Sequence, residues 1–292
     1  TAVGWWSLCL DTPVRSRPIC GIARLPRRPF RHFRHFRARL LPSLGGDNLV
    51  VKRSISDGQW LLTLNNPQRG NALGPDLVQA LTEQMEAACS DPQVHTVVLT
   101  GEGPHFCTGL DLSDLSDLSD GDLLWRLVHI ERLLSLIWNA PIRTVAVAHG
   151  RTWGAGADLF AACERRLALE GATFRFPGVH FGIALGTRRL AQRLGEDAAR
   201  QCLLEGWELS VDQAHDRGLV QAKLSSLDQA WTQIAPLRVG QDVAARLRAA
   251  MRLDAAGQAD SDLAHLVRSA ARPGLKARIE AYRASLKSER SR

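Results

Sequence analysis

The segment of this sequence that could most clearly carry out chemistry is a run of small residues that ends in an acid, Gly154-Ala155-Gly156-Ala157-Asp158. Glycines at the end of a strand allow tight turns, in which the backbone comes close to a ligand and its N–H groups can bind negative charge. The run does not begin a dinucleotide-binding turn, because Leu159 stands where that turn needs its third glycine. Asp158 can act as a general acid or base, or it can simply cap the helix that follows.

Other common catalytic and metal-binding patterns are absent from the sequence. It has no phosphate-binding P-loop, no HExxH zinc motif and no G-x-S-x-G nucleophile turn. Outside the first 46 residues the histidines stand singly, without the spacing of metal ligands, and the six cysteines form no CxxC pair. We therefore predict no metal site and no redox cofactor, and the scattered cysteines indicate a reducing, cytoplasmic location.

A repeated acid marks the segment LDLSDLSDLSDGDLL, residues 110–124. The spacing of its aspartates suggests a calcium loop, but the segment does not match the EF-hand pattern D-x-[DN]-x-[DN]-G with its distal glutamate. We interpret it instead as a solvated loop whose Ser and Asp residues can cap the next helix.

The composition is that of a globular chain with a sizeable core, since 45% of its 292 residues are hydrophobic and 23% are charged. No apolar run reaches the roughly 18 residues of a membrane-spanning helix, so we predict no membrane partner. The net charge of +7 is confined to residues 1–46, where nine arginines against one acid give +8. The remaining residues therefore sum to −1, and this part of the chain gives no electrostatic indication of a nucleic-acid partner.

Residues 1–46 are rich in arginine and proline, and we interpret them as a disordered or spurious N-terminal extension. The same composition leaves two alternatives open, an organellar transit peptide and an arm that contacts nucleic acid or a membrane.

The elements that must position the glycine-rich run alternate between strands and helices. Residues 48–66 read as a hairpin around Asp57-Gly58, 72–91 and 122–140 as amphipathic helices, and 94–103 and 142–150 as buried strands. This order predicts an α/β domain over residues 47–222. From residue 197 the pattern turns helical, and we expect the helical region 223–292 to pack on the core or on another subunit and to mediate oligomerisation.

Three segments together resemble one family. They are LTLNNPQRGNALGPDLVQAL at 62–81, VVLTGEGPHFCTGLDLSDL at 97–115 and VAVAHGRTWGAGADLFAAC at 145–163, supported by ATFRFPGVHFGI at 172–183 and SVDQAHDRGLV at 210–220. In this order and spacing they resemble the crotonase family, the enoyl-CoA hydratase/isomerase superfamily, over residues 48–222. The resemblance implies an α/β fold of the crotonase type, a spiral of ββα units with a helical C-terminal region. It also implies a homotrimer or a dimer of trimers, and an acyl-CoA thioester as substrate, without metal or redox cofactor.

The resemblance also implies a site. Reactions beside a thioester carbonyl pass through an enolate, and one preorganised N–H donor at such an oxygen contributes about 3–4 kcal/mol. The family's two donors correspond to the backbone N–H groups of Leu110, which follows Gly109, and of Ala155, which follows Gly154. Asp158 corresponds to the first catalytic carboxylate. For the phosphates of coenzyme A, the resemblance points to the loop around Arg69 and to a cationic cluster on the last helix, Lys276, Arg278, Arg283 and Lys287.

The sequence departs from the family at the second catalytic carboxylate, where it has Gly178. A single carboxylate suits double-bond isomerisation better than hydration, which uses both an acid and a base. His180 and Arg175 lie close to this position in the sequence and could substitute for the acid, although His180 is more typical of a core or interface residue. The alternative is a catalytically silent or decarboxylase-like acyl-CoA-binding relative.

Trp125, Trp138 and Trp153 could line an acyl tunnel, but packing in the core is the more common role of such side chains.

Overall fold

An antiparallel hairpin opens the described part of the chain, as the Asp57-Gly58 turn predicts. The computed structural model describes residues 50–234, 237, 239–252 and 254–290, so the N-terminal extension predicted for residues 1–46 lies outside the described residues. Strand β1 (Val51–Ser56) pairs with β2 (Gln59–Leu64), and Asp57 and Gly58 between them both have positive φ.

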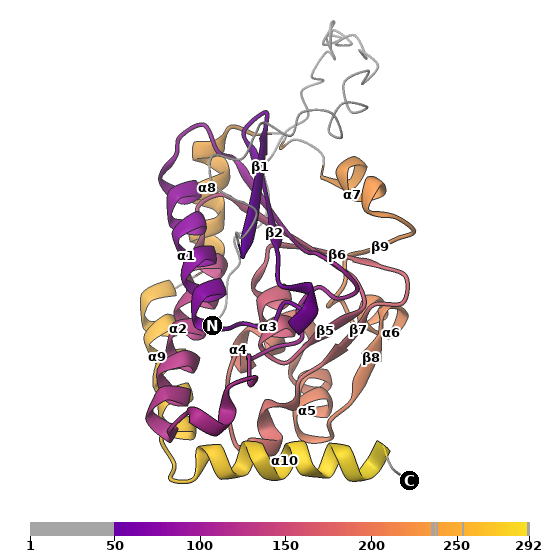
Figure 1. Cartoon of the computed structure of the whole chain (residues 1–292). Coiled ribbons are helices and arrows are strands. Elements are labelled where there is room, and N and C mark those ends of the chain that lie inside the picture. Colours follow the sequence, from indigo (N-terminus) through magenta and orange to yellow (C-terminus); the bar gives the residue numbers. More distant parts are fainter. Residues whose placement is uncertain (1–49, 235–236, 238, 253, 291–292) are drawn as a thin grey trace, which may run out of the picture. The chain divides into compact units, whose positions relative to one another are not determined.

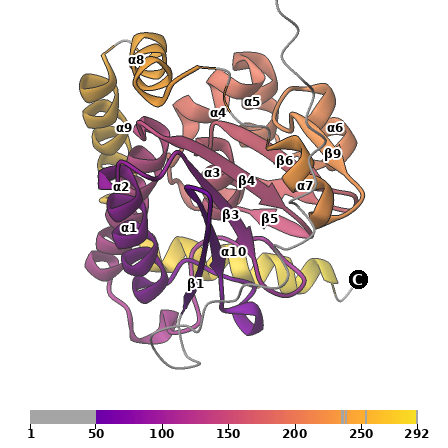
Figure 2. The ribbon, with the colours of Figure 1, turned by 90° about the horizontal axis from the view of Figure 1, so that it is seen from above.

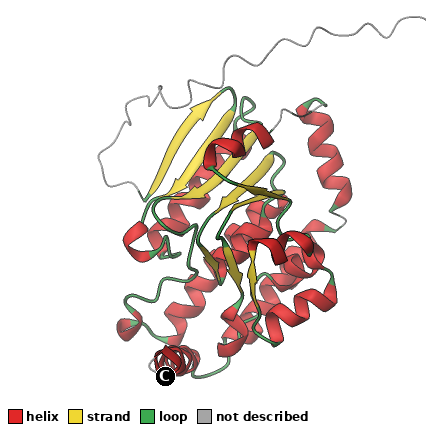
Figure 3. Cartoon of the chain, turned by 90° about the vertical axis from the view of Figure 1, so that its right-hand side faces the viewer, coloured by secondary structure: helices red, strands yellow, loops and turns green. Residues whose placement is uncertain are grey.

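The hairpin forms one edge of a six-stranded sheet in which the later strands are parallel (Figures 1 and 3). After β1 and β2, its strands in spatial order are β3 (Thr96–Gly101), β4 (Arg143–Ala148), β6 (Arg165–Leu169) and β9 (Ala222–Leu224). The strands β3 and β4 are buried along almost their whole length and are rich in apolar residues, because both of their faces are covered.

Alternate residues of the central strands face two different hydrophobic clusters. Val97 and Leu99 of β3 belong to the large core, whereas Val98 between them packs in a smaller cluster on the opposite face. Helix α7 (Leu227–Gln233) contributes Ala230 to that smaller cluster. The large core therefore lies on the side of the sheet that carries the glycine-rich run.

The large core is covered by helices α1 (Pro75–Ser90), α2 (Asp120–Asn139) and α3 (Ala155–Ala162). Ser119 caps α2 as the sequence predicts, since its Oγ accepts the Asp122 N–H at 3.2 Å and the Asp122 carboxylate accepts the Ser119 N–H at 2.9 Å. Figure 2 shows α1 and α2 side by side at one flank of the sheet.

A second sheet of three short strands carries the turn before α3. Its strands are β5 (Arg151–Trp153), β7 (Thr173–Arg175) and β8 (Glu208–Ser210). In the chain, the helices α4 (Thr187–Leu194) and α5 (Glu196–Leu204) lie between β7 and β8, and α6 (Val211–Asp216) follows β8. This completes the α/β architecture expected for a crotonase-type fold.

The C-terminal region consists of α8 (Gln241–Met251), α9 (Ala255–Ala270) and α10 (Leu275–Arg290). The end of the sequence reads as one helical stretch, but a break at Pro273-Gly274 separates α9 from α10. The Asp120 carboxylate at the start of α2 accepts the N–H groups of Gly274, Leu275 and Lys276, at 2.8, 3.1 and 2.8 Å. These hydrogen bonds lower the pKa of Asp120 and fix the first turn of α10, which Figure 1 shows running across one end of the fold.

No helix in the described residues is long and apolar enough to cross a membrane.

Candidate active site

A cavity of about 470 Å³ opens where the three-stranded sheet, α3 and α10 meet. Six of the residues to which the resemblance assigns a role line it: Arg69, Gly109, Leu110, Gly154, Ala155 and Asp158. They come from three separate segments, so the fold brings together residues that lie far apart in the chain. Most of the remaining wall is apolar, with Phe176, Ile183 and Leu185 among its side chains.

Two backbone turns meet at the edge of this cavity. Gly109 has φ of 104°, and a Cβ there would lie 3.0 Å from the Trp153 carbonyl oxygen and 3.4 Å from the Ala155 nitrogen. Hydrogen bonds also join the two segments, since the Trp153 N–H donates to the Cys107 carbonyl at 3.0 Å. Glycine at position 109 therefore permits both the left-handed conformation and the close approach to Ala155.

The N–H groups of Leu110 and Ala155 are candidate anion donors. Neither group has a hydrogen-bond partner in the described part of the chain. On either side of Leu110, the Gly109 carbonyl and the Asp111 N–H pair with the backbone of Leu73, and the Leu110 N–H takes no part in that pairing. Ala155 is the first residue of α3, where N–H groups have no partner within the helix and the helix dipole favours negative charge. The arrangement can bind an oxyanion.

Asp158 lies in the first turn of α3 and is only 6% exposed. Its carboxylate accepts no hydrogen bond from the residues that the structure describes. Burial raises the pKa of Asp158 well above its usual range, and the nearby charge of Glu131 adds to this effect, whereas Arg189 opposes it. A carboxyl with a raised pKa in an apolar cavity is suited to accept and return a proton.

The absence of a side chain at Gly186 leaves room for the Asp158 carboxylate. Gly186 precedes α4 with φ of 63°, and a Cβ on it would overlap the Asp158 carboxylate. The helix that follows is anchored by a buried ion pair, in which Arg189 donates to Glu131 of α2 at 2.5 and 3.1 Å. The same guanidinium lies 3.3 Å from Asp262 of α9. Sequence reasoning missed this network, since nothing in residue spacing links α2, α4 and α9.

Gly178 lines the same cavity as Asp158, as its alignment with the family's second carboxylate predicts. A Cβ at this position would meet the Ile183 carbonyl oxygen at 3.4 Å, so a side chain can be accommodated. His180 does not replace the acid: it is exposed and stacks on Tyr282 of α10 with the ring centroids 5.2 Å apart. The structure does not place His180 in the core, because the short helical turn at 177–181 leaves it exposed against α10; that it faces another subunit stays a prediction.

The cations proposed for coenzyme A differ in their surroundings. Arg69 is half-exposed and donates to Asp111 at 3.2 Å and to the Ser113 hydroxyl at 2.8 Å. Of the C-terminal cluster, Arg283 lines the cavity and donates to the Leu112 carbonyl at 3.2 Å. Lys276 and Arg278 also donate to backbone carbonyl groups, but they do not line the cavity. The side chain of Lys287 lies outside the described residues.

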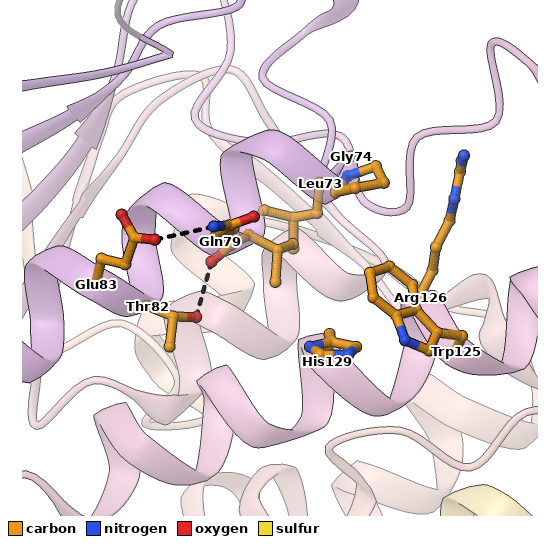
Figure 4. Close-up of a pocket in the computed structure, with 10 residues that line it drawn as sticks. Leu73, Gly74, Gln79, Thr82, Glu83, Trp125, Arg126 and His129 are labelled. Carbon is orange, nitrogen blue, oxygen red and sulfur yellow. Dashed lines mark hydrogen bonds between the residues drawn. The ribbon is translucent and has the colours of Figure 1, made fainter.

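The three tryptophans lie in three different places. Trp153 lines the cavity, and Trp138 is buried beside the guanidinium of Arg193. Trp125 is 53% exposed and borders a separate hollow between α1 and α2, together with His129 (Figure 4). The expectation of core packing is therefore wrong for Trp125, which lies on the outward face of α2.

The described residues contain no group of three or more His, Cys, Asp or Glu side chains that could hold a metal ion.

Comparisons with known proteins match this chain to one family. The sequence model of the enoyl-CoA hydratase/isomerase family matches residues 54–266. The zebrafish (Danio rerio) mitochondrial enoyl-CoA hydratase domain-containing protein 3 is 34% identical over 167 residues, which cover 56% of this chain and 58% of that protein. A Mycobacterium leprae protein described as a probable enoyl-CoA hydratase is 34% identical over 195 residues, covering 63% of this chain and 77% of its own length.

Among solved structures, a Bordetella parapertussis protein described as an enoyl-CoA hydratase/isomerase superposes with a TM-score of 0.77 at 39% identity. The match covers 81% of this chain and 99% of that one.

Proposed function

Because this chain belongs to the enoyl-CoA hydratase/isomerase family, we propose that it moves the double bond of an enoyl-CoA, with Asp158 as its only catalytic carboxylate. The N–H groups of Leu110 and Ala155 form the oxyanion hole, and Gly109 and Gly154 provide the turns that present them. Arg69 and Arg283 bind the phosphates of coenzyme A, which enters only as part of the substrate. The step involves no net oxidation or reduction and needs no redox cofactor.

The proposed step begins with the substrate's thioester oxygen between the two N–H donors. Asp158 removes a proton from the carbon beside the thioester carbonyl, and the electron pair of that C–H bond moves onto the oxygen as a dienolate. Asp158 then returns the proton to the carbon at the far end of the conjugated system, so the double bond changes place and the carboxylate is regenerated. The donors stabilise the charge that develops on oxygen, at about 3–4 kcal/mol for each.

One observation carries this proposal: a buried carboxylate and two backbone N–H groups without partners in the described residues line one apolar cavity. Gly178 supports isomerisation over hydration, because adding water across a double bond uses a second acid or base. The same Gly178 leaves a second function open, a protein that binds acyl-CoA thioesters without turning them over.

The test is to assay 3-enoyl-CoA isomerisation and 2-enoyl-CoA hydration side by side. We expect isomerisation to dominate, and Asp158→Asn to lower its rate by on the order of 10²–10⁴ while thioester binding is kept. The rate should rise with pH through the raised pKa of Asp158, because the base must be ionised. Gly178→Glu, for which the cavity has room, should increase hydration.

Two results would contradict the isomerase proposal. Saturable thioester binding without turnover would establish the binding-only function. Efficient hydration that is undiminished in Asp158→Asn would assign the chemistry to another residue.

We also propose a homotrimer, alone or paired as a dimer of trimers. What supports contact with another copy is a row of exposed apolar side chains on α8, Val243, Leu247 and Met251, at the spacing of one helical turn. Sedimentation of the full chain should give a trimer or a multiple of it, and Leu247→Glu should weaken the assembly. A monomeric wild-type protein would refute the proposal.

A further inference from the structure

The guanidinium of Arg175 is a charged group of the cavity for which the described chain provides no partner. Arg175 ends β7 and lines the cavity. Its Nε is buried without a hydrogen bond, and its side chain makes no hydrogen bond or ion pair with the residues that the structure describes. A buried N–H donor without a partner costs free energy, and a bound anion that accepts from the guanidinium would remove that cost.

Arg175 also lies next to the proposed reaction centre. Its carbonyl oxygen accepts the Gly154 N–H at 2.7 Å, one residue before the Ala155 donor. Two residues further along the chain, Pro177 packs near Gly154, and Gly178 follows it in the cavity wall. The backbone of Arg175 is thus fixed beside the oxyanion-hole turn, and its side chain lines the same cavity as Gly178, the position of the missing carboxylate.

The other charges of the cavity do not compensate Arg175. Asp111 is already paired with Arg69 at 3.2 Å. Asp158 lies in an environment that disfavours its ionised form. Arg283, the remaining charged side chain of the described wall, is a further cation. The cavity therefore holds an excess of positive charge inside a largely apolar wall, which favours a ligand that carries an anionic group within the cavity.

From this geometry we propose that Arg175 binds a carboxylate on the acyl group, so that the substrates are thioesters of dicarboxylic acids. This inference rests on the proposed acyl-CoA function and names the substrate class of that same site. A guanidinium can hold a carboxylate through two parallel hydrogen bonds, which fixes the far end of the acyl chain as well as attracting it. The phosphates of coenzyme A are the other anions that Arg175 could meet, and the experiment distinguishes the two.

The experiment measures the affinity of saturated thioesters by calorimetry, which requires no turnover. Monocarboxylic and dicarboxylic acyl groups of equal length are compared in pairs: propionyl-CoA with malonyl-CoA, butyryl-CoA with succinyl-CoA, and hexanoyl-CoA with adipyl-CoA. Wild type, Arg175→Gln and Arg132→Gln are tested, where Arg132 is an exposed residue of α2 that serves as a charge-matched control.

We expect the wild type and Arg132→Gln to prefer the dicarboxylic member of at least one pair. Arg175→Gln should lose about 10- to 100-fold in affinity for that member, the range of a hydrogen-bonded charged pair, and change little toward its monocarboxylic counterpart. Arg175→Lys, which keeps the charge without the paired donors, should recover part of the preference.

Two outcomes would overturn the inference. Equal losses for both members of every pair would assign Arg175 to the phosphates of coenzyme A, and the absence of any dicarboxylic preference in the wild type would remove the basis of the proposal. Failure of all thioesters to bind would instead refute the proposed acyl-CoA function itself.

Discussion

Replacing Asp158 with asparagine should stabilise the protein at neutral pH while it abolishes the proposed chemistry. The folded chain raises the pKa of Asp158, whereas in the unfolded chain the carboxyl titrates near its ordinary value of about 3.9. Between these two pKa values the native state keeps a proton that the unfolded state has released. The free energy of unfolding therefore falls as pH rises, by up to about 1.4 kcal/mol per pH unit.

The asparagine side chain of the variant does not titrate, so the variant avoids this loss. The difference in unfolding free energy between Asp158→Asn and wild type should be constant below about pH 4 and then grow in favour of the variant until the raised pKa is passed. Urea unfolding, followed by tryptophan fluorescence at a series of pH values, measures the difference directly. Asp76→Asn, which removes an exposed carboxylate from α1, controls for the loss of one negative charge. Parallel curves for Asp158→Asn and wild type would refute the reasoning.

Two further variants probe the surroundings of Asp158. Gly171→Ala should cost roughly 1–2 kcal/mol because of its positive φ, and Gly186→Ala should cost at least as much, because its Cβ would also overlap the Asp158 carboxylate. Only Gly186→Ala should reduce turnover, since it displaces that carboxylate; equal turnover in the two variants would contradict this. Glu131→Gln should destabilise the fold by about 3–5 kcal/mol, because it leaves the buried Arg189 without a full counter-charge. It should also move the Asp158 titration to lower pH, and urea unfolding at several pH values tests both effects.

The sequence was sufficient to predict the elements that surround the site. The Asp57-Gly58 turn, the buried strands predicted at 94–103 and 142–150 and the capping of the next helix by a Ser or Asp each depend on local propensity. The structure confirms all three, with the strands at Thr96–Gly101 and Arg143–Ala148 and the cap at Ser119. The positions of Gly109, Gly154 and Asp158 in one cavity were predicted from three motifs in family order. Their catalytic roles remain predictions.

Contacts between distant segments could not be predicted in this way. The pairing of Glu131 with Arg189 and of Asp120 with the start of α10 depends on how three or more helices pack, and residue spacing carries no information about that packing. The outward position of Trp125 illustrates the same limit. Its aromatic type favours burial, but its place on α2 exposes it beside the second hollow.

The central claim is that Asp158 removes a proton from the carbon beside a thioester carbonyl, and the fate of a deuterium label on that carbon tests it most directly. A 3-enoyl-CoA that carries deuterium at this carbon is incubated with enzyme, and mass spectrometry and NMR follow the label in the recovered thioester. Wild type should remove the label from that carbon, whether the label then appears at the far end of the conjugated system or is lost to solvent. Asp158→Asn should remove it more slowly by on the order of 10²–10⁴, although it binds the thioester with the same affinity. Undiminished removal in Asp158→Asn would contradict the account, as would a wild type that binds the thioester and leaves the label in place.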